Sequence, residues 1–186
     1  MMSGRMRRLI VIAALAALLL TTATGCTKKR VLPAREGLGV DVGGLTYTVF
    51  ITRELNPRDV EDRDYIPPTD PGTGFAWFGV FLQVCNSDNG VPKTPTNDLR
   101  IVDTQGNTYT PTALPPTAVF AYRPVQLDAK RCIPAPGSAA SSGPTAGSLV
   151  VFKLPIAGIE NRPLDLEIAP PATGEAPKRQ RIELDI

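Results

Sequence analysis

Hydrophobic and polar residues alternate along several short stretches of the chain, which is the pattern of half-buried β-strands. Residues 45–52 alternate apolar positions with mostly threonine, and residues 164–168 and 182–186 alternate leucine or isoleucine with charged residues. Residues 75–84 are apolar in both phases. We therefore expect residues 75–84 to form a core strand that is covered on both faces.

Further strands are expected between turns rich in proline and glycine. Residues 99–102 and 109–110 predict a hairpin, and residues 148–154 predict another strand. Residues 119–125 with Leu127 predict one or two more, where Pro124 favours a sheet edge. No segment after the N-terminal leader has a convincing 3.6-residue period. The sequence thus predicts an all-β fold, an immunoglobulin-like antiparallel β-sandwich of about seven to nine strands.

The N-terminus has the order of a secretory leader. Three arginines precede an uncharged 12-residue apolar run at residues 9–20, which is short of the roughly 20 residues that a membrane-spanning helix needs. We expect a signal peptide over residues 1–25, with an uncleaved membrane anchor as the alternative. A flexible tether over residues 26–37 and a sandwich domain over residues 38–186 complete the expected organisation.

The end of the leader, Ala23-Thr24-Gly25-Cys26, resembles the lipobox of bacterial lipoproteins, with alanine where leucine is commoner. The resemblance implies that Cys26 is lipidated, with palmitate among its acyl groups, and becomes the mature N-terminus. The lipid anchor would attach the protein to the extracytoplasmic face of the cell membrane. A cysteine that stands there by chance is the remaining interpretation.

Composition excludes several function classes. The 186 residues contain no histidine, which removes histidine-dependent triads and zinc sites, and all three methionines lie in the leader. Cleavage before Cys26 leaves 17 basic residues against 18 acidic ones, a net charge of −1. Such a balance lacks the basic footprint of a nucleic-acid-binding protein. We expect neither a metal nor another cofactor.

Two cysteines, Cys85 and Cys132, remain after Cys26 is assigned to lipid. An even number of cysteines in an exported domain favours one disulfide. Their separation of 47 positions is too long for a CxxC redox or zinc pair. We therefore expect a structural disulfide.

A long loop between two expected strands, residues 56–74, is the candidate recognition element. Its candidate partner contacts are Asp59, Asp62, Asp64, Tyr65 and Ile66. A tolerated insertion, a solvated charge run, a calcium site and an acid–base pair are the alternatives. Trp77, just beyond the loop, is interpreted as a core residue, with stacking on a sugar or peptide as the alternative.

Three stretches, residues 44–52, 78–86 and 147–155 followed by 161–168, together resemble an uncharacterised family of bacterial immunoglobulin-like lipoproteins. Members of that family are similar in fold to a secreted mycobacterial immunoprotective antigen. The resemblance covers about residues 38–170 and implies a fold and a location, but it brings no catalytic residue.

Two function classes remain. The first is a non-catalytic cell-envelope lipoprotein that binds another envelope protein or a surface component through its loops. The second is a secreted hydrolase that uses paired carboxylates, or a serine and a lysine brought together by the fold. Carboxylates that converge in a cleft would favour the hydrolase. The sequence leaves the ligand and the oligomeric state open.

Overall fold

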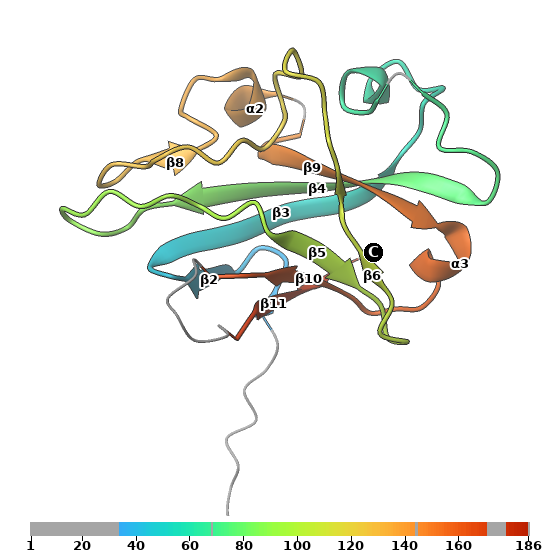
Figure 1. Cartoon of the computed structure of the whole chain (residues 1–186). Coiled ribbons are helices and arrows are strands. Elements are labelled where there is room, and N and C mark those ends of the chain that lie inside the picture. The colour runs from blue at the N-terminus through green and yellow to red at the C-terminus, as the bar shows by residue number, and fades with distance from the viewer. Residues whose placement is uncertain (1–33, 68, 144, 171–177, 186) are drawn as a thin grey trace, which may run out of the picture. The chain divides into compact units, whose positions relative to one another are not determined.

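The computed structural model of the protein describes residues 34–67, 69–143, 145–170 and 178–185. These residues form an all-β sandwich, which confirms the expected fold class (Figure 1). The described residues contain eleven strands rather than seven to nine. The excess arises because four strands have only two residues each, too short for a periodicity to reveal them.

One sheet has five strands in the order β1-β11-β10-β5-β6. These strands are β1 (Ala34–Arg35), β11 (Gln180–Leu184), β10 (Leu164–Ile168), β5 (Leu99–Val102) and β6 (Thr108–Tyr109). Pairing is antiparallel except between β1 and β11, which are parallel. The β5–β6 hairpin expected from the sequence is confirmed.

The other sheet has six strands: β2-β3-β4-β9-β7 in order, with β8 also paired to β4. These strands are β2 (Gly39–Val42), β3 (Leu45–Leu55), β4 (Phe75–Cys85), β9 (Ser148–Pro155), β7 (Pro111–Thr112) and β8 (Cys132–Ile133). The two long central strands, β3 and β4, have 11 residues each. Three short helical turns complete the described elements: η1 (Asp62–Asp64), α2 (Ala139–Ser142) and α3 (Ile156–Ile159).

The two faces of β4 are buried against different layers. Phe78 and Val80 point into the core between the sheets, together with Leu164 and Ile182 from the five-stranded sheet. Trp77 belongs to a second cluster on the outer face of the six-stranded sheet. Figure 1 shows the segments that cover this outer face, the teal loop with η1 and the chain around α2, above the sheet. Both alternating sets of residues in 75–84 are therefore apolar because each set packs into a separate core, as expected for a strand covered on both sides.

The expected strands at residues 119–127 are wrong. This segment makes only isolated bridges, one between Ala121 and Leu149 and one between Leu127 and Lys93. Proline at position 124 has no N–H with which to continue a ladder, so the segment crosses the sheet edge as an irregular connection.

The fold begins earlier than the expected boundary at residue 38. Ala34 and Arg35 pair with Ile182 and Glu183, and the Glu36 amide donates to the Glu183 carbonyl at 3.2 Å. The end of the expected tether is thus an edge strand. A parallel pairing of two residues leaves no alternation in the sequence, which is why the pattern missed it.

The outer face of the five-stranded sheet carries a row of charges across neighbouring strands. Glu167 on β10 lies between Arg100 on β5 and Arg181 on β11, at 2.5 Å and 2.6 Å. Burial alone would raise the pKa of Glu167, but the hydrogen bond from Arg100 and the positive charges beside it lower the pKa below its ordinary value. Expected to be half-exposed, this glutamate is buried because two arginines cover it.

Candidate interaction surface

The loop at residues 56–74 folds back onto the outer face of the six-stranded sheet. Tyr65 and Ile66 pack there with Leu55, Trp77 and Phe81. The Tyr65 ring meets the edge of Phe81 at a centroid distance of 5.3 Å and that of Phe120 at 4.7 Å. Tyr65 and Ile66 are only 4% and 7% exposed. The sequence-based expectation that they offer an exposed apolar contact is therefore wrong.

Asp62, another expected partner contact, is a structural residue. Its carboxylate accepts hydrogen bonds from the Arg53 guanidinium at 2.6 Å and from the Asn56 amide at 2.8 Å. The Arg53 guanidinium also lies 5.8 Å from the ring centroid of Tyr65 and 5.7 Å from that of Phe81. Asp62 is 4% exposed, so a partner would reach it only if the loop opened.

The far end of the loop is fixed by Trp77. Its indole N–H donates to the Thr69 carbonyl at 3.0 Å, and the side chain is 5% exposed. Trp77 is therefore a core residue, as interpreted from the sequence. The loop is an integral cover of the second core, and its removal would expose Leu55, Trp77 and Phe81 to water.

Asp59 and Asp64 remain exposed on the loop surface. The Asp59 carboxylate accepts a hydrogen bond from the Glu61 amide at 2.9 Å, which is a local turn contact. These two residues are the expected contacts that a partner can reach in the folded loop.

The same loop contains a cavity of about 360 Å³. It is lined by Pro57, Arg58, Arg63, Ile66, Pro67, Thr69 and Asp70. The exposed guanidinium groups of Arg58 and Arg63 lie beside the apolar wall that Ile66 and the prolines form. In the described part of the chain neither arginine makes an ion pair.

Sequence reasoning missed Arg58 and Arg63 because it treated them as counter-charges to their acidic neighbours. Asp62, however, is paired with Arg53 on β3 rather than with either of them. A sequence signal was available in the two arginines placed among four prolines of one loop. The cavity thus supplies apolar contact together with donors suited to an anionic group.

Two adjoining cavities lie along the irregular segment at residues 119–128. One, of about 370 Å³, is lined mainly by apolar residues that include Leu99, Tyr122 and Leu149. The other, of about 430 Å³, includes Cys132 and Ser138. The Ser138 hydroxyl oxygen is buried and has no hydrogen-bond partner among the described residues.

Carboxylates gather in one small recess, of about 140 Å³, lined by Arg35, Glu36, Glu183 and Asp185. Burial raises the pKa of Glu36 above its ordinary value, and the nearby Asp185 charge adds to this effect. The Glu36 carboxylate already accepts hydrogen bonds from the Thr52 hydroxyl and the Asp185 amide, the latter at 2.9 Å. Its bonds therefore hold the first described strand to β3 and to the end of β11.

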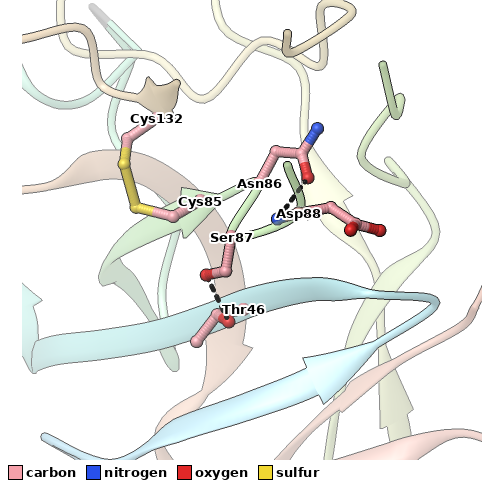
Figure 2. The surroundings of a disulfide bond; sticks show 6 residues. All are labelled: Thr46, Cys85, Asn86, Ser87, Asp88 and Cys132. Atoms are coloured by element: carbon pink, nitrogen blue, oxygen red, sulfur yellow. Dashed lines mark hydrogen bonds between the residues drawn. A yellow bond between two sulfur atoms is a disulfide. The ribbon is translucent and has the colours of Figure 1, made fainter. Parts of the chain in front are cut away.

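The Cys85–Cys132 disulfide is present, as expected, with the two Cα atoms 4.1 Å apart (Figure 2). It joins directly paired residues of β4 and β8 within one sheet, unlike the inter-sheet disulfide of antibody domains. Next to it, the Asn86 side-chain amide donates to the carbonyls of Val91 and Leu127, and its carbonyl oxygen accepts from the Asp88 amide. The disulfide thus ties the short strand β8 to β4, while the Asn86 side chain holds the segments at Val91 and Leu127 together.

Neither a metal cluster nor a membrane-spanning helix is found in the ranges that the structure describes. No group of three or more histidine, cysteine, aspartate or glutamate side chains there is arranged to hold a metal ion. No helix among the same residues is long and apolar enough to cross a membrane. Cys26, the expected lipidation site, lies outside the described residues.

Comparison with known proteins adds one structural neighbour. No protein-family model matches the chain, and the search of curated proteins gives no significant match. Among solved structures, the yjhA protein from Bacillus subtilis matches with a TM-score of 0.49 and 9% sequence identity, over 82% of this chain and 99% of that one. A similarity of this size carries no argument about fold or function.

Proposed function

We propose that this protein is a cell-envelope lipoprotein whose β-sandwich is a non-catalytic binding module. Its anchor is the acylated Cys26, at the extracytoplasmic face of the cell membrane. The leader-like N-terminus and the lipobox resemblance support the anchor. The disulfide supports an oxidising compartment, because disulfides persist outside the cytoplasm. The separate resemblance of residues 44–52, 78–86, 147–155 and 161–168 supports membership of the immunoglobulin-like lipoprotein family.

The observation that carries the binding role is the cavity in the loop at residues 56–74. Its volume of about 360 Å³ falls within the usual range for ligand pockets, about 300–1,000 Å³. Its wall is apolar at Ile66, Pro57 and Pro67, and its polar groups are Arg58, Arg63, Thr69 and Asp70. A cavity with an apolar wall and a few polar groups is the usual form of a recognition site.

The ligand that fits this lining has an anionic group next to an apolar one. Arg58 and Arg63 supply donors that match a carboxylate or phosphate, while the partly exposed Pro57 and Pro67 receive the apolar part. An acidic segment of an envelope protein, or an anionic surface component, has this chemistry. The exposed Asp59 and Asp64 of the same loop do not line the cavity, and they would meet polar or basic groups of the partner beside the bound anion.

The loop is already ordered before any ligand arrives. Asp62 holds its first half to Arg53, and Trp77 holds its second half at Thr69. A preorganised loop loses less conformational entropy on binding, so a small cavity gives useful affinity. This arrangement suits a binding module that holds its partner without chemical change.

Photo-crosslinking in intact cells tests the binding role. A photoreactive residue at position 64, exposed next to the cavity, is expected to give a specific crosslinked species, and one at Val91, which is 60% exposed outside the loop, is expected to give none. The double variant Arg58→Ser/Arg63→Ser, probed from position 64, should lose the species because the anionic group has lost its donors.

Arg131→Ser is the matched control, since Arg131 is an exposed arginine distant in sequence from the loop. It should leave the crosslinked species unchanged. Equal crosslinking by the wild type and the double variant would contradict recognition through this cavity. Turnover of a cell-wall or peptide substrate by the purified protein would instead support the hydrolase alternative.

A further inference from the structure

The loop at residues 56–74 covers only part of the outer face of the six-stranded sheet, and the covered part ends between two cross-strand neighbours. Phe81 on β4 and Ile51 on β3 are directly paired, yet Phe81 is 0% exposed and Ile51 is 41% exposed. Loop residues such as Tyr65 cover Phe81. The half of β3 that includes Ile51 therefore keeps an open outer face.

Phe50, the neighbour of Ile51, is also exposed because β3 is irregular at this point. The register of β3 against β4 shifts between Val49 and Ile51, so Phe50 has no partner on β4. Such a bulge inserts one residue without a partner on the neighbouring strand and locally interrupts the alternation of side chains. Phe50 is 41% exposed, and the preceding outer positions of β3, Thr46 and Thr48, carry no charge.

A third exposed apolar residue comes from the entry of the chain into the fold. The Gly37 amide donates to the Val49 carbonyl at 2.7 Å, which places Leu38 beside the bulge. Leu38 is 58% exposed. We name Leu38, Phe50 and Ile51 the entry patch.

We propose that the entry patch rests on the lipid bilayer into which Cys26 is anchored. This inference relies on the proposed lipid anchor. Ala34 begins β1, so eight peptide steps separate it from Cys26, and they span at most about 28 Å. The anchored chain therefore enters the fold close to both the membrane and the entry patch.

Because the lipid anchor already attaches the protein to the membrane, a small contact area is sufficient to hold the domain against the bilayer. Once the acyl chains are inserted, contact between the domain and the bilayer is intramolecular, and its effective concentration is high. Phenylalanine, isoleucine and leucine side chains gain free energy when they leave water for the interfacial region. Arg35 lies next to the patch, because its carbonyl accepts from the Leu38 amide at 3.1 Å. Its side chain pairs with Glu183 at 3.2 Å but is 68% exposed, so its remaining guanidinium donors can reach lipid phosphates. These contacts turn the entry patch toward the membrane and hold the domain in one orientation relative to the bilayer.

Tryptophan fluorescence in proteoliposomes tests the inference. Trp77 is the only tryptophan of the chain, and because it is buried it serves as a constant background. Phe50→Trp is introduced into the full-length acylated protein, in vesicles of phosphatidylcholine and phosphatidylglycerol brominated near the head group. The matched control is Val119→Trp, at an exposed position outside the entry patch. Near-ultraviolet circular dichroism verifies the fold, and Ile51→Trp replaces Phe50→Trp if that variant unfolds.

The brominated lipid is expected to quench the emission that the new tryptophan at position 50 adds, because an interfacial tryptophan lies at the depth of the head groups. It should leave the emission added at position 119 unchanged. A protein that floats with the vesicles but shows no quenching at position 50 overturns the membrane contact and leaves the anchor intact. Quenching at both positions also overturns it, as does a blue-shifted but unquenched tryptophan at position 50, which means that a protein surface covers the patch. A protein that does not float refutes the anchor and the inference together.

Discussion

Arg53 and Asp62 form an ion pair with 2.6 Å between guanidinium nitrogen and carboxylate oxygen, and this pair joins the long loop to strand β3. The same carboxylate accepts from the Asn56 amide, so it closes the first turn of the loop. Arg53 lies in addition within cation–π distance of Tyr65 and Phe81. Asp62 thus orders the loop backbone, and its partner Arg53 connects the ion pair to the aromatic layer beneath the loop.

The first prediction concerns this pair. Asp62→Asn should lower the free energy of unfolding by about 1–3 kcal/mol, because the guanidinium of Arg53 loses its charged acceptor at the buried position 62. Urea unfolding followed by Trp77 fluorescence measures the change, since Trp77 packs in the same cluster. Asp64→Asn, at an exposed neighbouring position, should change the free energy by less than about 0.5 kcal/mol. Equal effects of the two variants would show that Asp62 does not stabilise the loop.

The second prediction concerns the disulfide. Replacing both Cys85 and Cys132 by alanine should lower stability by about 4 kcal/mol, because the bond closes a loop with a sequence separation of 47 in the unfolded chain. Thermal unfolding of the double variant and the wild type measures this loss. Two alkylatable thiols in the native, unreduced protein would show that the bond is absent in solution.

The third prediction concerns Asp103, which follows β5. Burial alone would raise its pKa, but hydrogen bonds from Asn107, Asn161 and Tyr109 lower the pKa to about 2. A folded-state pKa below the unfolded value of 3.8 means that the stabilisation is present above pH 3.8 and is lost as the pH falls through about 2. Asp103→Asn should cost about 1–3 kcal/mol at neutral pH.

Acid unfolding monitored by circular dichroism tests this account of Asp103. The stability difference between the wild type and Asp103→Asn should narrow as the pH is lowered from 3.8 toward 2. A difference that stays constant over this pH range would contradict the charged hydrogen-bond network.

The fourth prediction concerns Glu36, whose contribution to stability depends on pH in the opposite direction to that of Asp103. Burial raises its pKa above 4.5, so its contribution to stability is complete below pH 4.5 and declines as the pH rises through the higher folded-state pKa. Glu36→Gln keeps an oxygen that accepts from the Thr52 hydroxyl and the Asp185 amide. The glutamine variant should therefore become more stable relative to the wild type as the pH increases. Urea unfolding at a series of pH values measures this change. A difference between the urea midpoints of the two proteins that stays the same at every pH would refute this explanation.

The sequence predicted burial correctly where the residues of a single strand carry the whole signal. The two-phase apolar run of β4 predicted a strand buried on both faces, and both cores exist. The two cysteines predicted their own pairing for a similar reason, since compartment and count already restrict the choice.

The local sequence patterns did not predict how the loops pack against the rest of the fold. Asp62 and Tyr65 lie in a charged stretch that resembles a solvated loop, but Arg53, nine positions earlier, and Phe120, far along the chain, bury them. Glu167 follows the alternation of a half-exposed strand, yet arginines from two neighbouring strands cover it. In each case the burial depends on a partner that sequence spacing does not reveal.

Fatty-acid labelling tests the central claim, attachment to the envelope through Cys26, most directly. Cells that express the full-length protein are grown with radiolabelled palmitate, and the protein is purified under denaturing conditions. The wild type should carry the label and sediment with membranes, whereas Cys26→Ser should carry none, because it lacks the thiol that is acylated. Equal incorporation of label by the serine variant, or an unlabelled wild-type protein, would contradict the account.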